Sequence, residues 1–521
     1  MYIGLDCLLN RTNFIRCIAL ILFLFFTAML PANAEIQTIT ASGEYTMAEG
    51  ETMPVAKERA LAEAIKSAAE QAGIYIESYG RTSNVVLSED EVNILSRGIV
   101  EVLNKQYDEP RYFGNTCYLR VTITAMVNTD NIEALRQRFQ SGALAIDLKR
   151  MQAVYEDCQQ DIKKLKAQLA QASGNKKKDI VQRIAENERR YRIAGLIEQG
   201  YNSAVQENYE ASVQAFTQAI DLDQNYAFAY FSRGNAYYEL QQLDAALADH
   251  NKAIALDPAY DYAYYSRGVV YDNLNRCDLA LADYDQAIAI NPNNVYARNN
   301  RGIIYARDGR YDMALADYNK AIALDPTITN VYDNRGNAYF ALGQYQQALA
   351  DYEQSIRLNP SCQEAYQSRG QAKSILEQYE PAIADFNQAI LLGLNTTHVY
   401  RNRGMAHHQL ARYQEAITDY DKAIQLDPSD AINYFYRGVS KYGLKQFEAA
   451  IADCDKAIEL NPGKLSDTYF YKGLSLVYLQ RAQEAIDALR LYIRYGNEAD
   501  RIEFAKSIII QLEGMLQAGY K

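Results

Sequence analysis

The sequence has no tryptophan and only four histidines, and its seven cysteines never form a C-x-x-C pair. Metal centres need closely spaced His and Cys ligands, and a catalytic nucleophile needs a neighbouring base, so the composition offers little material for either. Basic residues are also in the minority, with 53 Lys and Arg against 65 Asp and Glu and a formal net charge of −12. Because nucleic-acid binding depends on a basic surface, we expect no nucleic-acid partner.

Motifs of known catalytic sites are missing as well: the chain has no glycine-rich phosphate loop, no H-E-x-x-H and no G-x-S-x-G. His407 and His408 are adjacent, so on a helix they point to different faces and cannot bind one metal ion together. His250 stands where related segments carry tyrosine or phenylalanine, which favours a place in the core. We therefore predict a protein that is not an enzyme and that holds neither a metal nor a cofactor.

The first 34 residues have the pattern of a secretory signal peptide. Arg11 and Arg16 precede an apolar run from Cys17 to Leu30, and the Ala-x-Ala sequence of a cleavage site ends at Ala34. A permanent anchor is the alternative, but crossing a bilayer takes about 20 apolar residues and this run is shorter. We predict cleavage after Ala34, export to the periplasm or cell envelope, and no transmembrane span in the mature chain.

Export would place the remaining cysteines in an oxidising compartment, where a disulfide is possible. Their spacing gives no evidence for one, and burial as small apolar side chains is the favoured interpretation. These cysteines are Cys117, Cys158, Cys277, Cys362 and Cys454.

From residue 200 onward the sequence repeats itself. Glycines recur at intervals of 34 residues, with a last interval of 35, at positions 200, 234, 268, 302, 336, 370, 404, 438 and 473. A fixed period of this size indicates a solenoid built from helix pairs. An arginine precedes seven of these glycines, from Arg233 to Arg437.

Each repeat contains the elements of two packed helices. Tyrosines four residues before and three residues after the glycine fall on one face of a first helix, and the glycine lets a second helix approach closely. Small residues spaced around an aromatic residue form the packing seam of that second helix, and a proline ends it. Examples from one repeat are Tyr264, Gly268, Tyr271, Ala280, Tyr284, Ala287 and Pro292.

This pattern resembles the tetratricopeptide repeat over residues 193–497, or about nine repeats, followed by a capping helix over 498–521. The resemblance implies a mainly α fold, a right-handed superhelical α-solenoid. Departures occur at the ends and in the sixth repeat. They are Ser212 and Gln224 in the first repeat, Leu394 in the sixth and Tyr492 in the ninth.

Two smaller regions precede the repeats. Residues 35–130 combine an alternating strand over 117–127 with a helix whose apolar stripe is Leu61, Ala64, Ile65, Ala68, Ala69 and Ala72, and Ser88 and Glu91 are spaced as a capping box. These elements predict a small α+β domain. The stretches from Ala56 to Ser78 and from Tyr112 to Asn128 resemble the N-terminal domain of the flagellar assembly protein T family, which implies an envelope protein; an unrelated small α+β module is the alternative.

Residues 131–192 carry an apolar seam with heptad spacing that runs from Leu144 to Leu169. Ser173-Gly174-Asn175 interrupts it before Ile180, and the exposed tip is predicted at Lys176-Lys177-Lys178. We predict a helical hairpin; an intermolecular coiled coil, with self-association through residues 144–169, is the alternative.

The resemblance implies that the first helices line a groove that binds a protein or peptide partner. Repeats two to four are rich in aromatic residues there, and Asn235 and Asn299 are predicted to bond the ligand backbone. Packing of these tyrosines on neighbouring repeats is the alternative. The lysine–asparagine clamp of some relatives is absent, because Phe231 stands where its first lysine would be. The groove candidates are Phe228, Phe231, Asn235, Tyr262, Tyr265, Val269, Tyr296, Asn299, Asn337, Arg401, Met405 and Phe435.

The sequence as a whole predicts an exported, non-enzymatic scaffold that mediates protein–protein interactions in the bacterial cell envelope. Two alternatives remain open. One is a protein that binds glycan through exposed tyrosines as a cell-wall or export accessory, and the other is a regulatory subunit of an envelope enzyme.

Overall fold

A computed structural model describes residues 37–47, 100–113, 116–127, 158, 160–169, 171–462 and 465–517, together with single positions between 53 and 71. The predicted signal peptide, the capping box at Ser88 and the first half of the predicted hairpin lie outside these residues. The chain divides into two compact units, residues 1–290 and 291–521. No helix in the described ranges is long and apolar enough to span a membrane.

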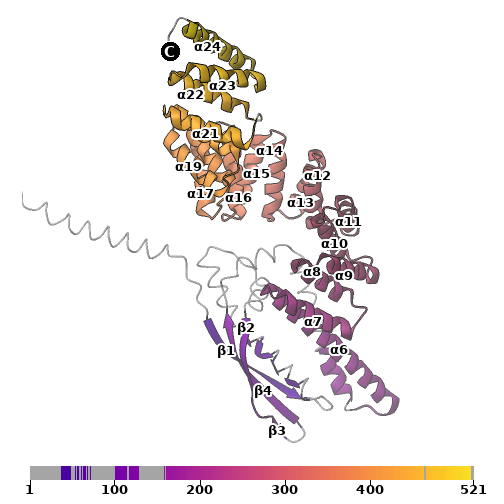
Figure 1. Cartoon of the computed structure of the whole chain (residues 1–521). Coiled ribbons are helices and arrows are strands. Elements are labelled where there is room, and N and C mark those ends of the chain that lie inside the picture. The colour runs from indigo at the N-terminus through magenta and orange to yellow at the C-terminus, as the bar shows by residue number, and fades with distance from the viewer. Residues whose placement is uncertain are drawn as a thin grey trace, which may run out of the picture. The chain divides into compact units, whose positions relative to one another are not determined.

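The first unit begins with a small antiparallel sheet in which β4 lies between β1 and β2 and also pairs with β3 (Figure 1). Strand β4 alternates as predicted: its odd-numbered residues from Cys117 to Ala125 are buried, whereas Tyr118 and Arg120 are exposed. The strands are β1 (Gln37–Met47), β2 (Val100–Tyr107), β3 (Arg111–Phe113) and β4 (Thr116–Val127).

Described helical positions between 53 and 71 pack against β1 through small residues. Ala56, Ala60, Ala64 and Ala68 are fully buried, and a side chain at Gly43 would overlap the backbone of Ala60 and Ala64. The predicted stripe was therefore wrong about Leu61 and Ile65, which are only half-buried. Alanine stands at the contact because the helix backbone lies too close to the sheet for a larger side chain.

A helical hairpin connects this region to the repeats. Residues 160–169 are helical, and Leu165 packs with Ile180 and Ile184 of α6 (Gly174–Val205) in one apolar cluster. The lysines at 176–178 are exposed in the first turn of α6, as predicted. The described part of the heptad seam is thus buried within one chain, while self-association through residues 144–169 stays a prediction.

The remaining helices form consecutive antiparallel pairs, α6–α7 through α22–α23, and confirm the mainly helical fold class. In the first unit they are α7 (Tyr209–Leu222), α8 (Ala227–Glu239), α9 (Leu243–Leu256), α10 (Asp261–Asn273) and α11 (Cys277–Ile290). In the second unit they are α12 (Val295–Arg307), α13 (Tyr311–Leu324), α14 (Thr329–Ala341), α15 (Tyr345–Leu358), α16 (Gln363–Ile375), α17 (Tyr379–Leu391), α18 (Thr397–Gln409), α19 (Tyr413–Leu426), α20 (Ala431–Gly443), α21 (Phe447–Leu460), α22 (Ser466–Tyr478), α23 (Ala482–Tyr495) and α24 (Ala499–Gln517).

The recurrent glycine of each first helix makes room for a side chain of the second helix. A Cβ at Gly268 would lie 2.7 Å from the ring of Tyr284, and Gly336 stands in the same relation to Tyr352. These two rings are buried. Where the aromatic residue is replaced by Cys454, a Cβ at Gly438 would lie 3.3 Å from the Ala450 carbonyl oxygen and 3.3 Å from Asp453 Cβ, both on α21. The glycine therefore serves ring insertion in most pairs and backbone approach in this one.

The arginine before each glycine forms a bidentate ion pair with a buried aspartate sixteen residues later. Its Nε and Nη2 donate hydrogen bonds of 2.5–3.0 Å to the two carboxylate oxygens, and the aspartates are only 3–6% exposed. The seven pairs are Arg233–Asp249, Arg267–Asp283, Arg301–Asp317, Arg335–Asp351, Arg369–Asp385, Arg403–Asp419 and Arg437–Asp453. Each joins the two helices of its own repeat.

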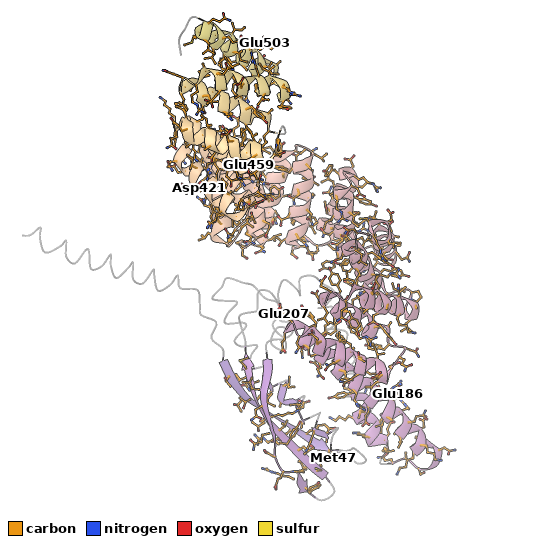
Figure 2. The ribbon with its side chains drawn as sticks, in the orientation of Figure 1. Met47, Glu186, Glu207, Asp421, Glu459 and Glu503 are labelled. Carbon is orange, nitrogen blue, oxygen red and sulfur yellow. The ribbon has the colours of Figure 1, made fainter. Side chains whose placement is uncertain are left out.

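In at least five of these arginines, Nη1 reaches the second helix of the preceding repeat. Arg335 on α14 donates to Asn319 on α13 as well as to Asp351 on α15, and Arg437 bonds Asp421, which Figure 2 labels on α19. Equivalent bonds join Arg233 to Thr217, Arg267 to Asn251 and Arg403 to Asn387. One guanidinium therefore ties three successive helices together.

The tyrosines of the first helix flank this guanidinium. The Arg335 guanidinium carbon lies 5.7 Å from the ring centre of Tyr332 and 5.9 Å from that of Tyr339. Where lysine replaces the later tyrosine, Lys373 and Lys441 instead contact the buried aspartates Asp385 and Asp453 at 2.7 Å. The tyrosines that the sequence assigned to packing thus also hold the arginine by cation–π contact.

Departures from the repeat pattern are accommodated locally. The Ser212 hydroxyl, in place of alanine, donates to the Gly200 carbonyl at 2.8 Å. Leu394, in place of proline, is buried beside Val399 after Gly393, whose φ is +106°. The last helix, α24, buries Ala505, Ile509 and Leu512 against α23, whereas its Glu503, labelled in Figure 2, is exposed. A polar outer surface is what a solenoid end requires.

Removing one arginine should show how much each ion pair contributes. We expect Arg335→Ala to lower the free energy of unfolding of α14–α16 by about 3–5 kcal/mol, because Asp351 would stay buried without its partner. Arg412→Ala is the control, since its pair with Glu380 is exposed and exposed pairs contribute about 0–1 kcal/mol. Hydrogen exchange under native conditions measures both, and equal losses would contradict a structural role for the buried pair.

The turn inside each helix pair contains one residue with positive φ. Only Gly309 and Gly343 are glycines at this place; elsewhere it is a residue such as Ala411, whose φ is +56°. L-residues are strained in this left-handed conformation. The full set at this place outside glycine is Glu207, Gln241, Asn275, Glu377, Ala411, Lys445 and Gln480.

Glycine exchanges at this turn should therefore change stability in opposite directions. We expect Ala411→Gly to raise the local free energy of unfolding by about 1 kcal/mol and Gly309→Ala to lower it by about the same amount. A side chain at Gly309 would meet no neighbour, so the backbone alone is tested. Urea unfolding of the two variants checks this, and changes of the same sign would refute it.

Candidate functional site

The first helices carry the predicted groove residues, and the structure separates them by exposure. On α8 and α10 of the first unit, Phe231 is 1% exposed and contacts Tyr260 at a ring distance of 4.9 Å, and Tyr262 is also buried. For Phe231 and Tyr262 the structure thus favours packing over ligand contact. The half-buried candidates of this unit are Phe228, Asn235, Tyr265 and Val269.

In the second unit, Asn299 is buried and its Oδ1 accepts a 2.9 Å hydrogen bond from Asn334 of the next first helix. This amide joins α12 to α14, which leaves little of it for a peptide. Asn337, by contrast, is exposed. The half-buried candidates of this unit are Tyr296, Arg401, Met405 and Phe435.

Asn337 is exposed but held in a fixed orientation. The hydroxyl of Tyr352, whose ring fills the space beside Gly336, donates a 2.8 Å hydrogen bond to Asn337 Oδ1. Burial raises the pKa of the Tyr352 phenol, so the hydroxyl keeps its proton. Because the amide oxygen is engaged, the two N–H groups of Asn337 remain as donors for a carbonyl of a bound chain.

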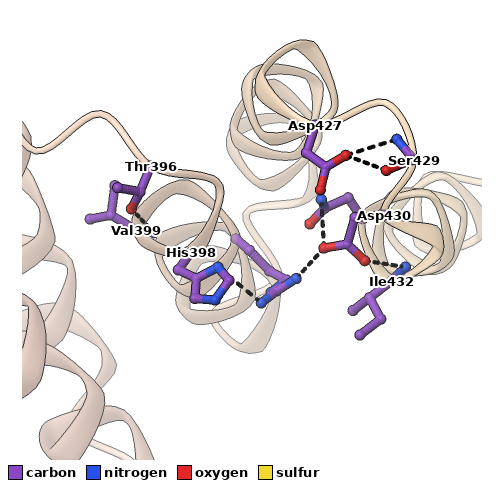
Figure 3. A network of polar contacts seen from close by, with 9 residues as sticks. Thr396, His398, Val399, Asp427, Ser429, Asp430 and Ile432 are labelled. Carbon is purple, nitrogen blue, oxygen red and sulfur yellow. Dashed lines mark hydrogen bonds and ion pairs between the residues drawn. The ribbon is translucent and has the colours of Figure 1, made fainter. Parts of the chain in front are cut away.

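Arg401 belongs to an internal network between α18 and α20 (Figure 3). Its Nη1 donates a 2.5 Å hydrogen bond to Asp430 Oδ2, and Nη2 lies 3.5 Å from His398 Nδ1. Asp430 in turn caps α20 by accepting from the Ile432 backbone amide at 3.0 Å. Arg401 therefore neutralises a helix-capping carboxylate, which limits its freedom to bind a ligand.

Sequence reasoning missed an aromatic cluster on α20, α21 and α22. Tyr442 lies within 6.0 Å, between ring centres, of Phe447, Tyr471 and Tyr478. Phe447 and Tyr478 stack at 4.6 Å with an interplanar angle of 3°, and Tyr478 is 61% exposed. Burial raises the pKa of Tyr442 to about 12. The cluster escaped prediction because its members occupy different positions in their repeats.

The structure places the adjacent histidines His407 and His408 in separate environments. His407 lies 4.0 Å from Asp419 of its own repeat, whereas His408 contacts Ser440 of the next repeat at 2.9 Å. The pair thus diverges as predicted. In the part of the chain that the structure describes, no group of three or more His, Cys, Asp or Glu is placed to hold a metal ion.

The five described cysteines are free thiols. Cys117, Cys158 and Cys454 are buried, as expected for small apolar side chains, and Cys277 and Cys362 are half-buried. Burial raises the pKa of Cys362 to about 11 and that of Cys454 to about 12. Neither thiol is therefore an activated nucleophile at neutral pH.

Family models match the helix pairs along most of the repeat array. Models described as "Tetratricopeptide repeat" match residues 295–328, 331–362, 363–392, 399–430 and 433–464. A model described as "TPR repeat" matches residues 205–241, 234–275 and 273–309. The helix pairs in these ranges are tetratricopeptide repeats. Tetratricopeptide repeats typically form scaffolds for protein–protein interactions. The matches give no indication of catalytic activity.

Individual proteins match parts of the chain. Neutrophil cytosol factor 2 of Mus musculus is 42% identical over 50 residues, so the match spans 10% of this chain and 10% of that protein. Among solved structures, YrrB, titled "a TPR protein with an unusual peptide-binding site", is 22% identical with a TM-score of 0.33, covering 36% of this chain and 97% of its own.

Two further solved structures are similar at the same level. Pseudomonas aeruginosa pilF is 22% identical with a TM-score of 0.37, covering 40% of this chain and 93% of its own. PilW, titled "widely conserved type IV pilus biogenesis factor", is 22% identical with the same TM-score, covering 39% and 94%. Likeness at this level concerns the repeat fold and carries no functional argument.

His250 occupies the ring position of its repeat, against Gly234, and is fully buried. Neither ring nitrogen has a hydrogen-bond partner within the described residues. Burial, followed by the nearby Arg267 charge, lowers the pKa of His250 to about 3. Because the unfolded histidine binds a proton below its ordinary pKa of 6.5, its contribution to stability is present above pH 6.5 and is lost as the pH falls from there towards 3.

The α8–α10 segment should accordingly be acid-sensitive. Between pH 7.5 and pH 5 we expect its free energy of unfolding to fall by about 2 kcal/mol because of His250. His250→Phe, which copies Phe386 beside Gly370, should remove that component, whereas the exposed His398→Phe should not. Hydrogen exchange at the two pH values measures this; the same pH dependence in His250→Phe and wild type would contradict it.

Proposed function

We propose that the chain is an exported, non-enzymatic scaffold that binds an extended peptide segment of a cell-envelope protein along its first helices. The tetratricopeptide fold supports the interaction role. The envelope location is supported by the signal-peptide pattern of residues 1–34 and by the resemblance of residues 35–130 to the flagellar assembly protein T family.

The observation that carries the peptide-binding role is the oriented amide of Asn337. It is exposed, and the buried Tyr352 hydroxyl fixes its oxygen, so its N–H groups are available to the solvent side. An exposed group with a fixed orientation suits recognition, since less conformational entropy is lost on binding. Backbone carbonyls of an extended peptide are acceptors of the required kind, and main-chain bonding gives affinity without demanding one sequence.

Substitutions on α14 and α15 separate this role from folding. Peptides of twelve residues would be selected by phage display on the full chain and their affinities measured by fluorescence polarisation. We expect Asn337→Ala to weaken binding about tenfold without loss of helicity, because a direct donor is removed. Tyr352→Phe should weaken binding less, since it removes only the group that orients the amide.

Asn299→Ala is the matched comparison. This asparagine is buried and bonded to Asn334, so its loss should lower stability more than affinity. If Asn337→Ala binds the peptides with unchanged affinity, the assignment of Asn337 on α14 to the peptide site is wrong. If no peptide is selected on the wild-type chain, the proposed function itself is contradicted.

A further inference from the structure

Successive first helices meet at a seam with a repeated geometry. The residue three positions before the recurrent glycine faces the residue that precedes the next first helix. At the α18–α20 seam these residues are Arg401 and Asp430, which form an ion pair with side chains only 15% and 19% exposed (Figure 3). The charges at this seam are therefore compensated inside the protein.

The equivalent residues at the α14–α16 seam are Asp333 and Cys362. The Cys362 thiol lies 3.8 Å from Asp333 Oδ2 and 3.8 Å from Glu364 Oε2, so it stands between two carboxyl groups. In the described ranges, no Lys, Arg or His forms an ion pair with either carboxylate. The α18–α20 seam thus has a cation and an anion, Arg401 and Asp430, whereas the α14–α16 seam has two carboxylates, Asp333 and Glu364.

Polar groups at this seam are incompletely satisfied within the described residues. Asp333 Oδ1 is buried without a hydrogen bond of good geometry, and the hydroxyl of the fully buried Ser355 on α15 lies close enough to the same carboxyl to lower its pKa as a donor. Ser355 occupies the place of Ala321 and Ala389 in neighbouring repeats, so this hydroxyl is not part of the common packing scheme. Burial, together with the negative charge of Glu364, raises the pKa of Asp333 to about 6.

We propose that Asp333, Glu364 and Ser355 form an acidic subsite that accepts the lysine or arginine side chain of a bound peptide. The cation would take the place that Arg401 fills at the α18–α20 seam. A guanidinium matches paired carboxylate oxygens by geometry, so arginine should bind better than lysine. This inference rests on the proposed peptide-binding function and names the chemistry that it selects.

The position of the subsite agrees with the proposed peptide path. Asp333 precedes Asn337 by four residues on α14, so the two lie on the same face of one helix. A peptide whose main chain bonds Asn337 could therefore place a basic side chain at Asp333. Glu364 is exposed, whereas Asp333 is partly buried, so the charge can enter from solvent and be partly desolvated on binding.

The test compares peptides selected on the full wild-type chain with their citrulline analogues, in which each arginine loses its charge but keeps its shape. We expect selected peptides to contain a basic residue at one register and to lose at least about tenfold in affinity on replacement by citrulline. The Asp333→Asn/Glu364→Gln variant should bind both forms equally. The Asp312→Asn/Glu448→Gln variant changes two exposed carboxylates of second helices and should retain the preference.

A second variant keeps the test independent of any folding defect. Asp333→Arg with Cys362→Asp recreates the Arg401–Asp430 arrangement and should fold with an internally filled subsite, so that the preference for arginine is lost while citrulline peptides still bind. Selected peptides that bind without dependence on a basic residue would overturn the subsite and leave the proposed function standing. A failure of every peptide to bind the wild-type chain would overturn both.

Discussion

The buried arginine–aspartate pair is the interaction on which the repeat array depends. Each guanidinium binds a carboxylate of its own repeat through two hydrogen bonds, and at least five of the seven also reach the preceding repeat with the remaining nitrogen, as Arg335 does with Asn319. A buried carboxylate is costly when unpaired, so neither partner is expected to persist alone. The end repeats agree with this reasoning. The first has Gln199 and Ala215 at these positions and the last has Lys472 and Ala488, so both partners change together.

Much of the array could be predicted from the sequence because it repeats. The 34-residue period fixed the helix pairs, and the recurring glycine and small residues marked their contact. The Arg-Gly dipeptide was visible too, but its role was not, because the aspartate sixteen residues later lies on another helix and looks like any exposed acidic residue in a linear sequence. Only the fold shows that Asp283 or Asp351 is buried.

The candidate site was less predictable for a related reason. Position within the repeat selected Phe231 and Tyr265 equally, yet Phe231 is buried against Tyr260 whereas Tyr265 is half-buried. Asn299 and Asn337 were likewise equivalent by pattern, but Asn334 engages one of them from the next helix. Exposure depends on which side chain the neighbouring repeat supplies, and a positional rule for one repeat does not contain that information. The helical stripe over Leu61 and Ile65 failed similarly, because Gly43 brings the sheet close to the alanines instead.

The geometry of the first helix explains how one framework can carry such different surfaces. The ion-paired arginine of each first helix lies two residues after one surface position and two residues before another, as Arg335 lies between Asp333 and Asn337. Two residues correspond to about 200° around an α-helix, so both positions lie away from the arginine. The flanking tyrosines, three residues before and four after the arginine, fall on the arginine's own side. Stability is thus concentrated on one face, and the residue two positions before the arginine can be Phe231, Asp333 or Arg401 on the other face without disturbing the ion pair. A side chain there is constrained chiefly by the adjoining repeat. Where that repeat supplies Asp430, Arg401 is neutralised from within; where it supplies Glu364, the negative charge of Asp333 is left for another molecule to balance.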